Sequence, residues 1–250
     1  MPCREHEYLR SFAEKGFVVV PKVVSAGLIE NAREAIAARV REDPPPPWHC
    51  GPHFYFIVRD LPPPLLSPLY DSGAISAAQS VIAPGTYDEP DHVQISLNIP
   101  PWSHRPDGPH IDGLTPPEAD GRPGTFTALA GIFLTDQTQE NCGNLWVWPG
   151  SHWGASQYLR QHGPDALLSA APYPPIKLAP PIQVTGCAGD LLLAHYLLGH
   201  NMGGNTSGRT REVLYFRLRR TGHRMHWRDI VQNPLLEFGP VQASLQHTPQ

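Results

Sequence analysis

The spacing of apolar residues at the start of the chain predicts two helices with a strand between them. Residues 5–15 repeat apolar positions at helical intervals. Residues 25–42 do the same, with Ser25 as a suitable N-cap and one side of the helix formed by Leu28, Ala32, Ala35, Ile36 and Val40. The intervening run GFVVVPKVV, residues 16–24, is typical of a short buried strand.

The next segment, residues 44–90, is interrupted by two clusters of prolines. The run PPPP ends the second helix, because proline lacks the backbone N–H that a helix requires. We expect one strand near HFYFIV, residues 53–58, and a short helix around residues 73–83 in an otherwise irregular segment. The proline-rich residues 44–70 are expected to shape the lid over a binding pocket.

From residue 91 onward, short apolar runs alternate with turns. These runs are HVQISLNI, FTALAGIFLTD, NLWVWPGS, IKLAPPIQVT, GDLLLAHYLL and REVLYFRLRR. Strands this short and this regularly broken predict an antiparallel sandwich or barrel, with one helix near GASQYLRQHG. We therefore predict a mainly β chain that forms a single domain over residues 1–250. Its helical N-terminal part, residues 1–45, is expected to pack on a β core at about residues 90–220.

The composition is that of a globular protein without an electrostatic preference for nucleic acid. Of the 250 residues, 40% are hydrophobic and 17% are charged, and the net charge is −4. No run of about 20 apolar residues is present, and the N-terminus lacks the apolar segment of a secretory signal. The four cysteines are scattered without a CxxC pair, so a disulfide scaffold is not expected. We expect a cytoplasmic protein that binds neither nucleic acid nor membranes; the pattern does not predict an oligomeric state.

The motif GPHIDG, residues 108–113, places two metal-binding side chains one residue apart. On a strand, His110 and Asp112 point to the same face; the structural alternative is a hydrogen-bonded pair in a turn. A third ligand is available at His195 or His200. His195 lies inside an apolar run, where a core histidine is the commoner outcome, whereas His200 ends that run beside a turn rich in glycine and asparagine.

Two histidines and one carboxylate form the facial triad of non-haem Fe(II) oxygenases. Iron accepts six ligands, so three positions remain for a chelating 2-oxo acid and dioxygen. The distal carboxylate of a 2-oxoglutarate co-substrate needs a partner when it is buried, and the planar guanidinium of arginine suits it best. Arg209 and Arg211 both follow His200, and spacing alone does not distinguish them.

Three blocks of the chain resemble successive motifs of the phytanoyl-CoA dioxygenase family, a branch of the Fe(II)/2-oxoglutarate-dependent oxygenases. The blocks are PHIDG, ENCGNLWVWPGSH and GDLLLAHYLLGHNMGGNTSGRTREVLYFRL. An isolated HxD is a weak signal, but HxD, PGSH, GD and a histidine followed by an arginine in this order and spacing are specific. The resemblance covers roughly residues 90–220 and implies a double-stranded β-helix, or jelly roll, with N-terminal helices.

The resemblance also implies roles for individual residues. The iron ligands of the family correspond to His110, Asp112 and His200. The 2-oxoglutarate arginine lies eleven residues after the distal histidine, which selects Arg211. A polar residue on the strand before the HxD often contacts the co-substrate, for which the candidates are Gln94 and Asn98. Two residues beyond the distal histidine, where many relatives have serine or threonine, this chain has Met202.

Other conspicuous residues have structural interpretations. The turn chemistry of PGSH favours a structural role for His152, and Trp146 and Trp148, which share a strand face, are expected in the core. The basic stretch RLRRTGHRMHWR, residues 217–228, is expected to be a solvated face, with contact to an anionic substrate as the alternative. Arg217 shares the parity of Arg211 on the predicted strand, so it is expected to face the interior.

The sequence therefore predicts an Fe(II)/2-oxoglutarate-dependent dioxygenase that hydroxylates a C–H bond of a small-molecule metabolite, using dioxygen and converting 2-oxoglutarate to succinate and CO2. One alternative is a non-catalytic jelly-roll binding protein, which succinate production distinguishes. The other is a metalloprotein of the cupin type that acts without 2-oxoglutarate. Arg211 discriminates against the latter, because such enzymes do not need it. The substrate itself cannot be read from the sequence.

Overall fold

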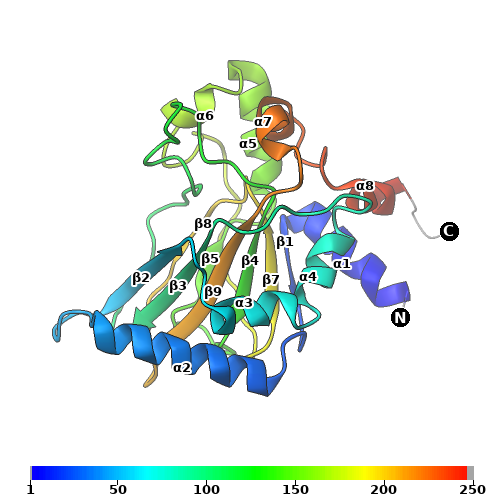
Figure 1. Ribbon diagram of the computed structural model, residues 1–250. Coiled ribbons are helices and arrows are strands. Elements are labelled where there is room, and N and C mark those ends of the chain that lie inside the picture. The colour runs from blue at the N-terminus through cyan, green and yellow to red at the C-terminus, as the bar shows by residue number, and fades with distance from the viewer. Residues whose placement is uncertain (1, 247–250) are drawn as a thin grey trace.

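The structure is a computed structural model that describes residues 2–246. Its strands are β1 (Phe17–Val20), β2 (Gly51–Val58), β3 (His92–Ile99), β4 (Ala128–Phe133), β5 (Leu145–Val147), β6 (Ile182–Gln183), β7 (Leu191–His195), β8 (His200–Met202) and β9 (Arg211–Leu218). Its helices are α1 (Pro2–Lys15), α2 (Ala26–Glu42), α3 (Pro63–Tyr70), α4 (Ala74–Ser80), α5 (Ser151–His162), α6 (Ala166–Ser169), α7 (His223–Gln232) and α8 (Gly239–Gln246). The strands form a six-stranded antiparallel sheet in the order β1-β7-β4-β9-β3-β2 and a three-stranded sheet in the order β6-β5-β8 (Figure 1).

Strand β9 shows how the large sheet serves two cores. Leu214, Phe216 and Leu218 belong to a core shared with the N-terminal helices, whereas Val213 and Tyr215 belong to a second core shared with the small sheet. This division follows from the two-residue period of a strand, which sends alternate side chains to opposite faces. Side chains at positions 211 and 217 have the parity of the second set and therefore face the space between the sheets.

The outer face of the large sheet is covered by helices. Figure 1 shows α2 and α3 lying across this face, with α1 and α8 side by side at one end. Phe12 of α1, Ala32 and Ile36 of α2 and Leu69 of α3 are almost fully buried in the shared core. The predicted helices at residues 5–15 and 25–42 are thus present, and each buries its apolar stripe against the sheet.

Two facing antiparallel sheets with this strand order form a double-stranded β-helix. The prediction of a mainly β fold with N-terminal helices packed on a jelly-roll core is confirmed. The strands predicted at residues 16–24 and 53–58 are β1 and β2, which pair at opposite edges of the large sheet. Most of the proline-rich segment 44–70 is therefore tied into the fold, and residues 51–58 are an edge strand.

Four helices, α3, α6, α7 and α8, were not predicted, and in α3 and α7 the helical signal is masked by other features. Helix α3 begins among prolines, which are tolerated at the first positions of a helix, where the backbone N–H has no intrahelical partner. Its Leu65 and Leu69 are buried and hold it on the core. Helix α7 begins within the basic stretch, but its Trp227 and Val231 are buried against the second core. Burial of a few apolar side chains in the tertiary structure therefore stabilises both α3 and α7 as helices.

Within residues 2–246, no helix combines the length and apolar character needed to cross a bilayer. Cys50, Cys142 and Cys187 are free thiols.

Candidate active site

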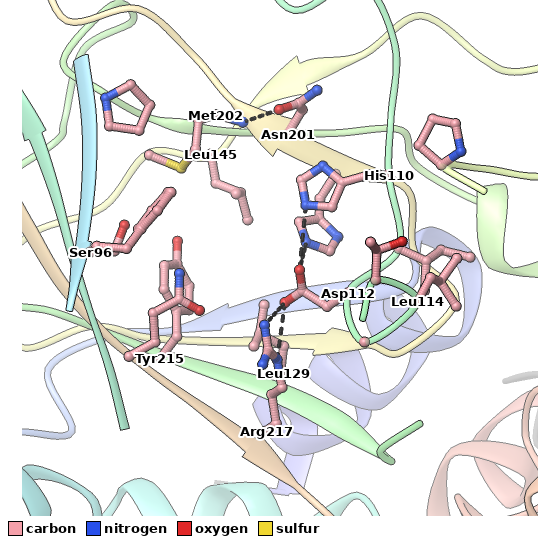
Figure 2. A pocket seen from close by; sticks show the side chains of 18 of the residues that line it. Ser96, His110, Asp112, Leu114, Leu129, Leu145, Asn201, Met202, Tyr215 and Arg217 are labelled. Atoms are coloured by element: carbon pink, nitrogen blue, oxygen red, sulfur yellow. Dashed lines mark hydrogen bonds and ion pairs between the residues drawn. The ribbon is translucent and has the colours of Figure 1, made fainter. Parts of the chain in front are cut away.

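A cavity of about 780 Å³ lies between the two sheets (Figure 2). The small sheet contributes Leu145 and Met202 to its wall, and residues 110–116 form a further side. The large sheet contributes side chains from four strands, among them Phe54, Phe56, Gln94, Ser96, Leu129, Tyr215 and Arg217. A cavity of this volume is in the range of pockets that bind small molecules.

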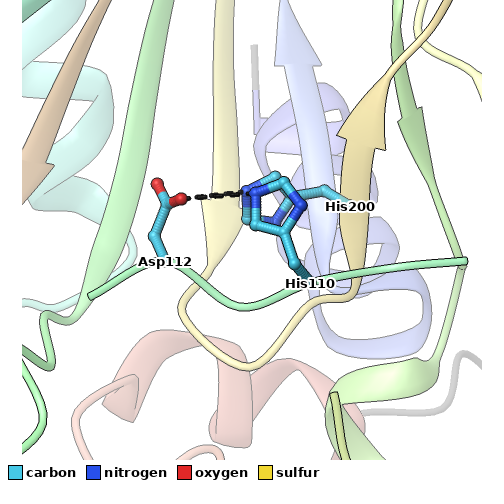
Figure 3. Close-up of side chains that lie close together, drawn as sticks. All are labelled: His110, Asp112 and His200. Carbon is cyan, nitrogen blue, oxygen red and sulfur yellow. Dashed lines mark ion pairs between the residues drawn. The ribbon is translucent and has the colours of Figure 1, made fainter. Parts of the chain in front are cut away.

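The three side chains grouped by the sequence meet in this cavity (Figure 3). Nε2 of His110 lies 3.4 Å from Oδ1 of Asp112, and Nε2 of His200 lies 3.7 Å from the same oxygen. One ligand atom of each residue lies within 4.8 Å of the others. Asp112 lies in a loop and His200 is the first residue of β8, so the fold brings together side chains that are 88 residues apart in the sequence.

The backbone around the HxD motif fixes this arrangement. His110 donates its N–H to the carbonyl of His200 at 2.9 Å, and the reverse hydrogen bond is 3.3 Å. This pairing is an isolated bridge, so Asp112 lies in the turn that follows and not on the regular strand that the sequence suggested. Gly113 has a φ of +77°, and a Cβ there would collide with the carbonyl of Gly124, so the chain can turn after Asp112 only with glycine.

The charge states of the three groups follow from their surroundings. Nδ1 of His200 lies 3.0 Å from the carbonyl of Leu198, to which it donates, so Nε2 is the ring nitrogen that faces Asp112. Burial lowers the pKa of His110, and the neighbouring His200 lowers it further. Burial also lowers the pKa of His200, but hydrogen bonding and attraction to Asp112 outweigh it, and the net direction is upward. Burial opposes ionisation of Asp112, but hydrogen bonds from both imidazoles and the charge of Arg217 hold its pKa well below the usual range.

This donor set fits a divalent metal. Nε2 of both imidazoles and a carboxylate oxygen converge on one point, and once the imidazoles release the protons on Nε2, their lone pairs and this oxygen can bind one cation. Two histidines and one carboxylate with open positions are the donors of non-haem Fe(II) sites. Among the residues that the structure describes, the group comprises His110, Asp112 and His200, so further coordination positions are left for other ligands. The hydrogen bond from Nδ1 of His200 is the kind of second interaction that orients a ligating histidine.

His195, the other histidine considered for the third ligand, lies in the core. Nε2 of His195 donates to the carbonyl of Pro234 at 2.6 Å, and Nδ1 accepts the N–H of Leu197 at 2.9 Å. Its ring packs against Phe12 and Phe238. Both ring nitrogens are therefore engaged, and burial lowers the pKa of His195 to about 4.

We expect this histidine to make the fold acid-sensitive. The pKa of His195 is about 4 in the folded protein and about 6.5 when unfolded, so below pH 6.5 the unfolded state binds more protons. The stability contributed by the neutral ring is thus present at neutral pH and is lost as pH falls toward 4. Between pH 8 and pH 5 the free energy of unfolding should decrease by about 2 kcal/mol from this group. Urea unfolding at pH 8 and pH 5 measures this decrease. In His195→Gln the decrease in the free energy of unfolding should be smaller than in the wild type. An equally large decrease in the variant would contradict the assignment of this acid sensitivity to His195.

Arg211 is buried, whereas Arg209 is exposed. Only 1% of the surface of Arg211 is accessible, and its guanidinium donates to Oε1 of Gln137 at 3.0 Å, to Oγ of Ser96 at 3.1 Å and to the hydroxyl of Tyr215 at 2.6 Å. All three partners are neutral, so the buried charge has no carboxylate partner within residues 2–246. A buried cation without a counter-charge is costly, which indicates that an anionic ligand completes the site.

The two candidates on β3 have different positions. Gln94 lines the cavity, whereas Asn98 is fully buried and donates to a backbone carbonyl in the loop after β8 at 2.8 Å. Met202 lines the cavity where many relatives have a hydroxyl-bearing residue. The hydroxyls of Ser96 and Tyr215, which also line the cavity, lie beside Arg211 instead.

Ser96, Gln137 and Tyr215 were missed by sequence reasoning. Parity was the available signal for two of them, because Ser96 lies between Gln94 and Asn98 on the same face of β3, and Tyr215 shares its face of β9 with Arg211. Gln137 lies in a loop, and no pattern in the sequence places a loop residue beside Arg211.

Arg217 contacts the triad directly. Its Nη2 and Nε lie 3.1 and 3.3 Å from Oδ2 of Asp112, and its Nη1 lies 3.1 Å from Nε2 of His92. Figure 2 shows Asp112 between the imidazoles and this guanidinium. The inward orientation predicted from parity is thus present, and the contact with Asp112 is an addition that spacing did not suggest.

The remaining residues singled out by the sequence are placed as follows. His152 is fully buried, donates from Nε2 to the carbonyl of Ala13 at 3.2 Å and does not line the cavity. Trp146 and Trp148 are buried in the core. In the basic stretch, Arg219, Arg224 and Arg228 form ion pairs with acidic side chains near the surface. The structural interpretations of these residues are therefore supported.

The comparisons with known proteins agree with this fold. Residues 101–213 match the family model described as phytanoyl-CoA dioxygenase. The match contains His110, Asp112, His200 and Arg211, the first two motif blocks and most of the third, and the resemblance is confirmed. Residues 101–213 are thus similar to the phytanoyl-CoA dioxygenase family, and this similarity supports an assignment as a dioxygenase-type oxidoreductase. No match was found among curated proteins.

Solved structures share the fold at low sequence identity. The carbocyclase SnoK from nogalamycin biosynthesis, described as non-heme and α-ketoglutarate-dependent, is 22% identical, with a TM-score of 0.59 over 85% of this chain and 82% of that chain. HygX from Streptomyces hygroscopicus, solved with nickel and 2-oxoglutarate, is 18% identical, with a TM-score of 0.57 over 86% of each chain. The epimerase SnoN, solved with Fe3+, α-ketoglutarate and nogalamycin RO, is 17% identical, with a TM-score of 0.58 over 88% of this chain and 84% of that chain.

Proposed function

We propose that the protein is an Fe(II)- and 2-oxoglutarate-dependent oxygenase that hydroxylates a C–H bond of a small molecule and converts 2-oxoglutarate to succinate and CO2. The observation that carries the proposal is one cavity with two complementary features. His110, Asp112 and His200 form a cluster of metal donors in its wall, and Arg211 lies behind the wall formed by Ser96 and Tyr215 with no counter-charge. A dicarboxylate that chelates a metal at one end and is paired at the other satisfies both features.

Each residue has a defined part in this proposal. His110, Asp112 and His200 hold the iron, which when bound supplies the activation of dioxygen. Arg211 binds the distal carboxylate of 2-oxoglutarate, with the hydroxyls of Ser96 and Tyr215 as neighbouring donors once they turn toward it. The remaining wall, including Gln94, holds the substrate and excludes water. Structural neighbours are described as a carbocyclase and an epimerase, so analysis of the product distinguishes hydroxylation from other oxidations at such a site.

We also propose that residues 1–250 act as one catalytic domain. Strand β1, from the helical N-terminal part, pairs with β7 inside the large sheet. Strand β2, from the proline-rich segment, pairs with β3 and contributes Phe54 and Phe56 to the cavity wall. Removal of either segment would expose the core of the catalytic sheet.

The proposal is tested by succinate formation. We expect protein reconstituted with Fe(II) to convert 2-oxoglutarate slowly to succinate in air even without substrate, and to do so only when metal, 2-oxoglutarate and dioxygen are all present. His226→Ala, which changes an exposed histidine outside the cavity, serves as a control that retains this activity. Tight binding of metal and 2-oxoglutarate without succinate in the presence of a metabolite library would favour a non-catalytic binding protein. Oxidation of a substrate without 2-oxoglutarate would favour the cupin-type alternative.

A further inference from the structure

The edge strand β2 presents an aromatic face to the cavity. Tyr55 is 4% exposed and packs toward the helices, whereas its neighbours Phe54 and Phe56 are 39% and 51% exposed and line the cavity. Within the described residues β2 pairs only with β3, so the large sheet ends at β2 and these rings form the margin of the site. Large apolar side chains left exposed at the rim of a pocket mark a ligand-binding surface.

Further flat rings extend this face. The ring of Trp102 lies against Gly51, the first residue of β2, where an added Cβ would come within 2.8 Å of it. Trp102 also stacks on His104, with ring centroids 4.4 Å apart and an interplanar angle of 14°. Both side chains line the cavity. Flat rings along one wall gain most from a flat apolar partner, by stacking and by area buried.

The charges of the cavity disfavour a cationic ligand. Asp112 is the carboxylate among the described residues that line it, and its two oxygens already face Arg217 and the imidazoles of His110 and His200. The metal proposed for the triad would add further positive charge. An ammonium group entering this space would lose its hydration without meeting a free carboxylate.

We propose that the substrate presents a flat, largely apolar ring system to the aromatic face of β2 and carries no positive charge. This inference rests on the proposed function, because it concerns the same cavity. It excludes the polycationic aminoglycosides, a class that includes hygromycin B, which is bound in a structure of the neighbour HygX.

The test uses protein loaded with Mn(II) in place of Fe(II) and with saturating 2-oxoglutarate. The co-substrate site is then occupied, and no turnover takes place during the titration. Anthraquinone-2-sulfonate, a flat anionic probe, should bind saturably in calorimetric titrations, and hygromycin B should not. The double variant Phe54→Ala/Phe56→Ala should weaken binding of the anthraquinone at least tenfold. The control Val58→Ala changes an exposed residue on the same face of β2 that does not line the cavity, and it should leave the affinity unchanged.

Saturable binding of hygromycin B, or equal anthraquinone affinity in the double variant and the wild type, would overturn the inference. Binding of Mn(II) and 2-oxoglutarate is measured in the same samples. Failure of those two ligands to bind would count against the proposed function, whereas failure of the anthraquinone alone counts only against the substrate class.

A different observation assigns a role to Arg217. The two oxygens of Asp112 are divided between partners: Oδ1 faces the imidazoles at 3.4 and 3.7 Å, and Oδ2 accepts from Arg217 at 3.1 and 3.3 Å. Arg217 is itself held, because Nη1 donates to Nε2 of His92 at 3.1 Å. His92 is bound in turn through Nδ1 to Asp91 at 2.5 Å, and Asp91 pairs with Arg219 at 2.6 Å. This chain of contacts fixes the guanidinium from the surface inward.

The geometry points to Arg217 as a positioning residue. It holds Oδ2 of Asp112 in hydrogen bonds, so that only Oδ1 is left to bind the metal. The inference rests on the proposed metal site and concerns how many coordination positions stay open there. A carboxylate that bound through both oxygens would occupy one of the positions that a chelating co-substrate needs. Arg217 prevents this by holding the second oxygen in a two-point, charge-assisted contact.

The test counts water molecules on bound Mn(II) by water-proton relaxation. In Arg217→Met, Asp112 is free to bind through both oxygens, so we expect one fewer bound water, a Mn(II) affinity that is equal or higher, and 2-oxoglutarate binding weakened about tenfold. A merely structural role would weaken Mn(II) and 2-oxoglutarate binding together. Arg228→Met, which removes an exposed arginine of α7 that contacts neither Asp112 nor this chain of contacts, should keep the wild-type water count.

Arg217→Lys provides a second variant that retains the charge. A lysine gives one contact instead of two, so its water count and 2-oxoglutarate affinity should lie between those of the wild type and Arg217→Met. An unchanged water count and unchanged 2-oxoglutarate affinity in Arg217→Met would overturn the role. Failure of Mn(II) to bind to the wild-type protein would instead count against the proposed metal site.

Discussion

Replacement of His200 by alanine is expected to abolish Fe(II) binding and succinate formation while leaving the fold intact. The variant removes one of three donors, and removal of groups that merely orient ligands already costs roughly 10–100-fold in metal affinity, so loss of a donor should exceed roughly 100-fold. His110→Ala should have the same effect, because its Nε2 faces the same oxygen of Asp112. Metal content after reconstitution, measured by mass spectrometry, and Mn(II) titration give the result directly.

His226→Ala is the control for both variants, because His226 is an exposed histidine that lies outside the cavity and outside the donor group. Its metal content should equal that of the wild type. Circular dichroism and the melting temperature verify that each variant folds. Normal occupancy in a folded His200→Ala or His110→Ala protein would show that the ligands are misassigned. His195 would not then be the replacement, because both of its ring nitrogens are engaged by backbone groups.

The architecture could be predicted from the sequence because its determinants are local and periodic. Alternation along residues 211–218 separates Leu214 and Phe216 from Val213 and Tyr215, and the structure sends these pairs to different cores. The apolar stripe of residues 25–42 likewise becomes the buried side of α2. Elements whose existence depends on tertiary packing, such as α3 and the three-residue strand β8, gave no comparable signal.

Those site residues that belong to sequence motifs could be predicted from the sequence. The spacing of His110 and Asp112 suggested one shared direction, although the backbone achieves it with a bridge and a turn in place of a strand. The contacts around Arg211 were not predictable in the same way. Gln137 reaches the guanidinium from a loop, and only the folded chain shows that every partner of this cation is neutral.

That neutral environment makes Arg211→Ala the second variant with a large expected effect. The variant would leave the buried distal carboxylate of 2-oxoglutarate without its charge partner, which typically costs about 3–5 kcal/mol. At about 1.4 kcal/mol per tenfold, 2-oxoglutarate binding should weaken by roughly two orders of magnitude or more. Arg209→Ala is the matched control, because Arg209 is exposed and two residues away, and its effect should be much smaller. Titration of the Mn(II)-loaded proteins with 2-oxoglutarate measures both.

A second ligand separates the loss of charge pairing from general damage to the site. In Arg211→Ala the groups that contacted the guanidinium also lose a donor, so a decrease in stability is expected as well. 2-Oxobutyrate keeps the chelating end of the co-substrate but has no distal carboxylate, so the wild type and a folded variant should bind it with similar affinity. The preference for 2-oxoglutarate over 2-oxobutyrate should therefore collapse in Arg211→Ala and persist in Arg209→Ala. If the preference persisted in Arg211→Ala and collapsed in Arg209→Ala, the exposed arginine would be the co-substrate ligand and the buried charge of Arg211 would need another partner.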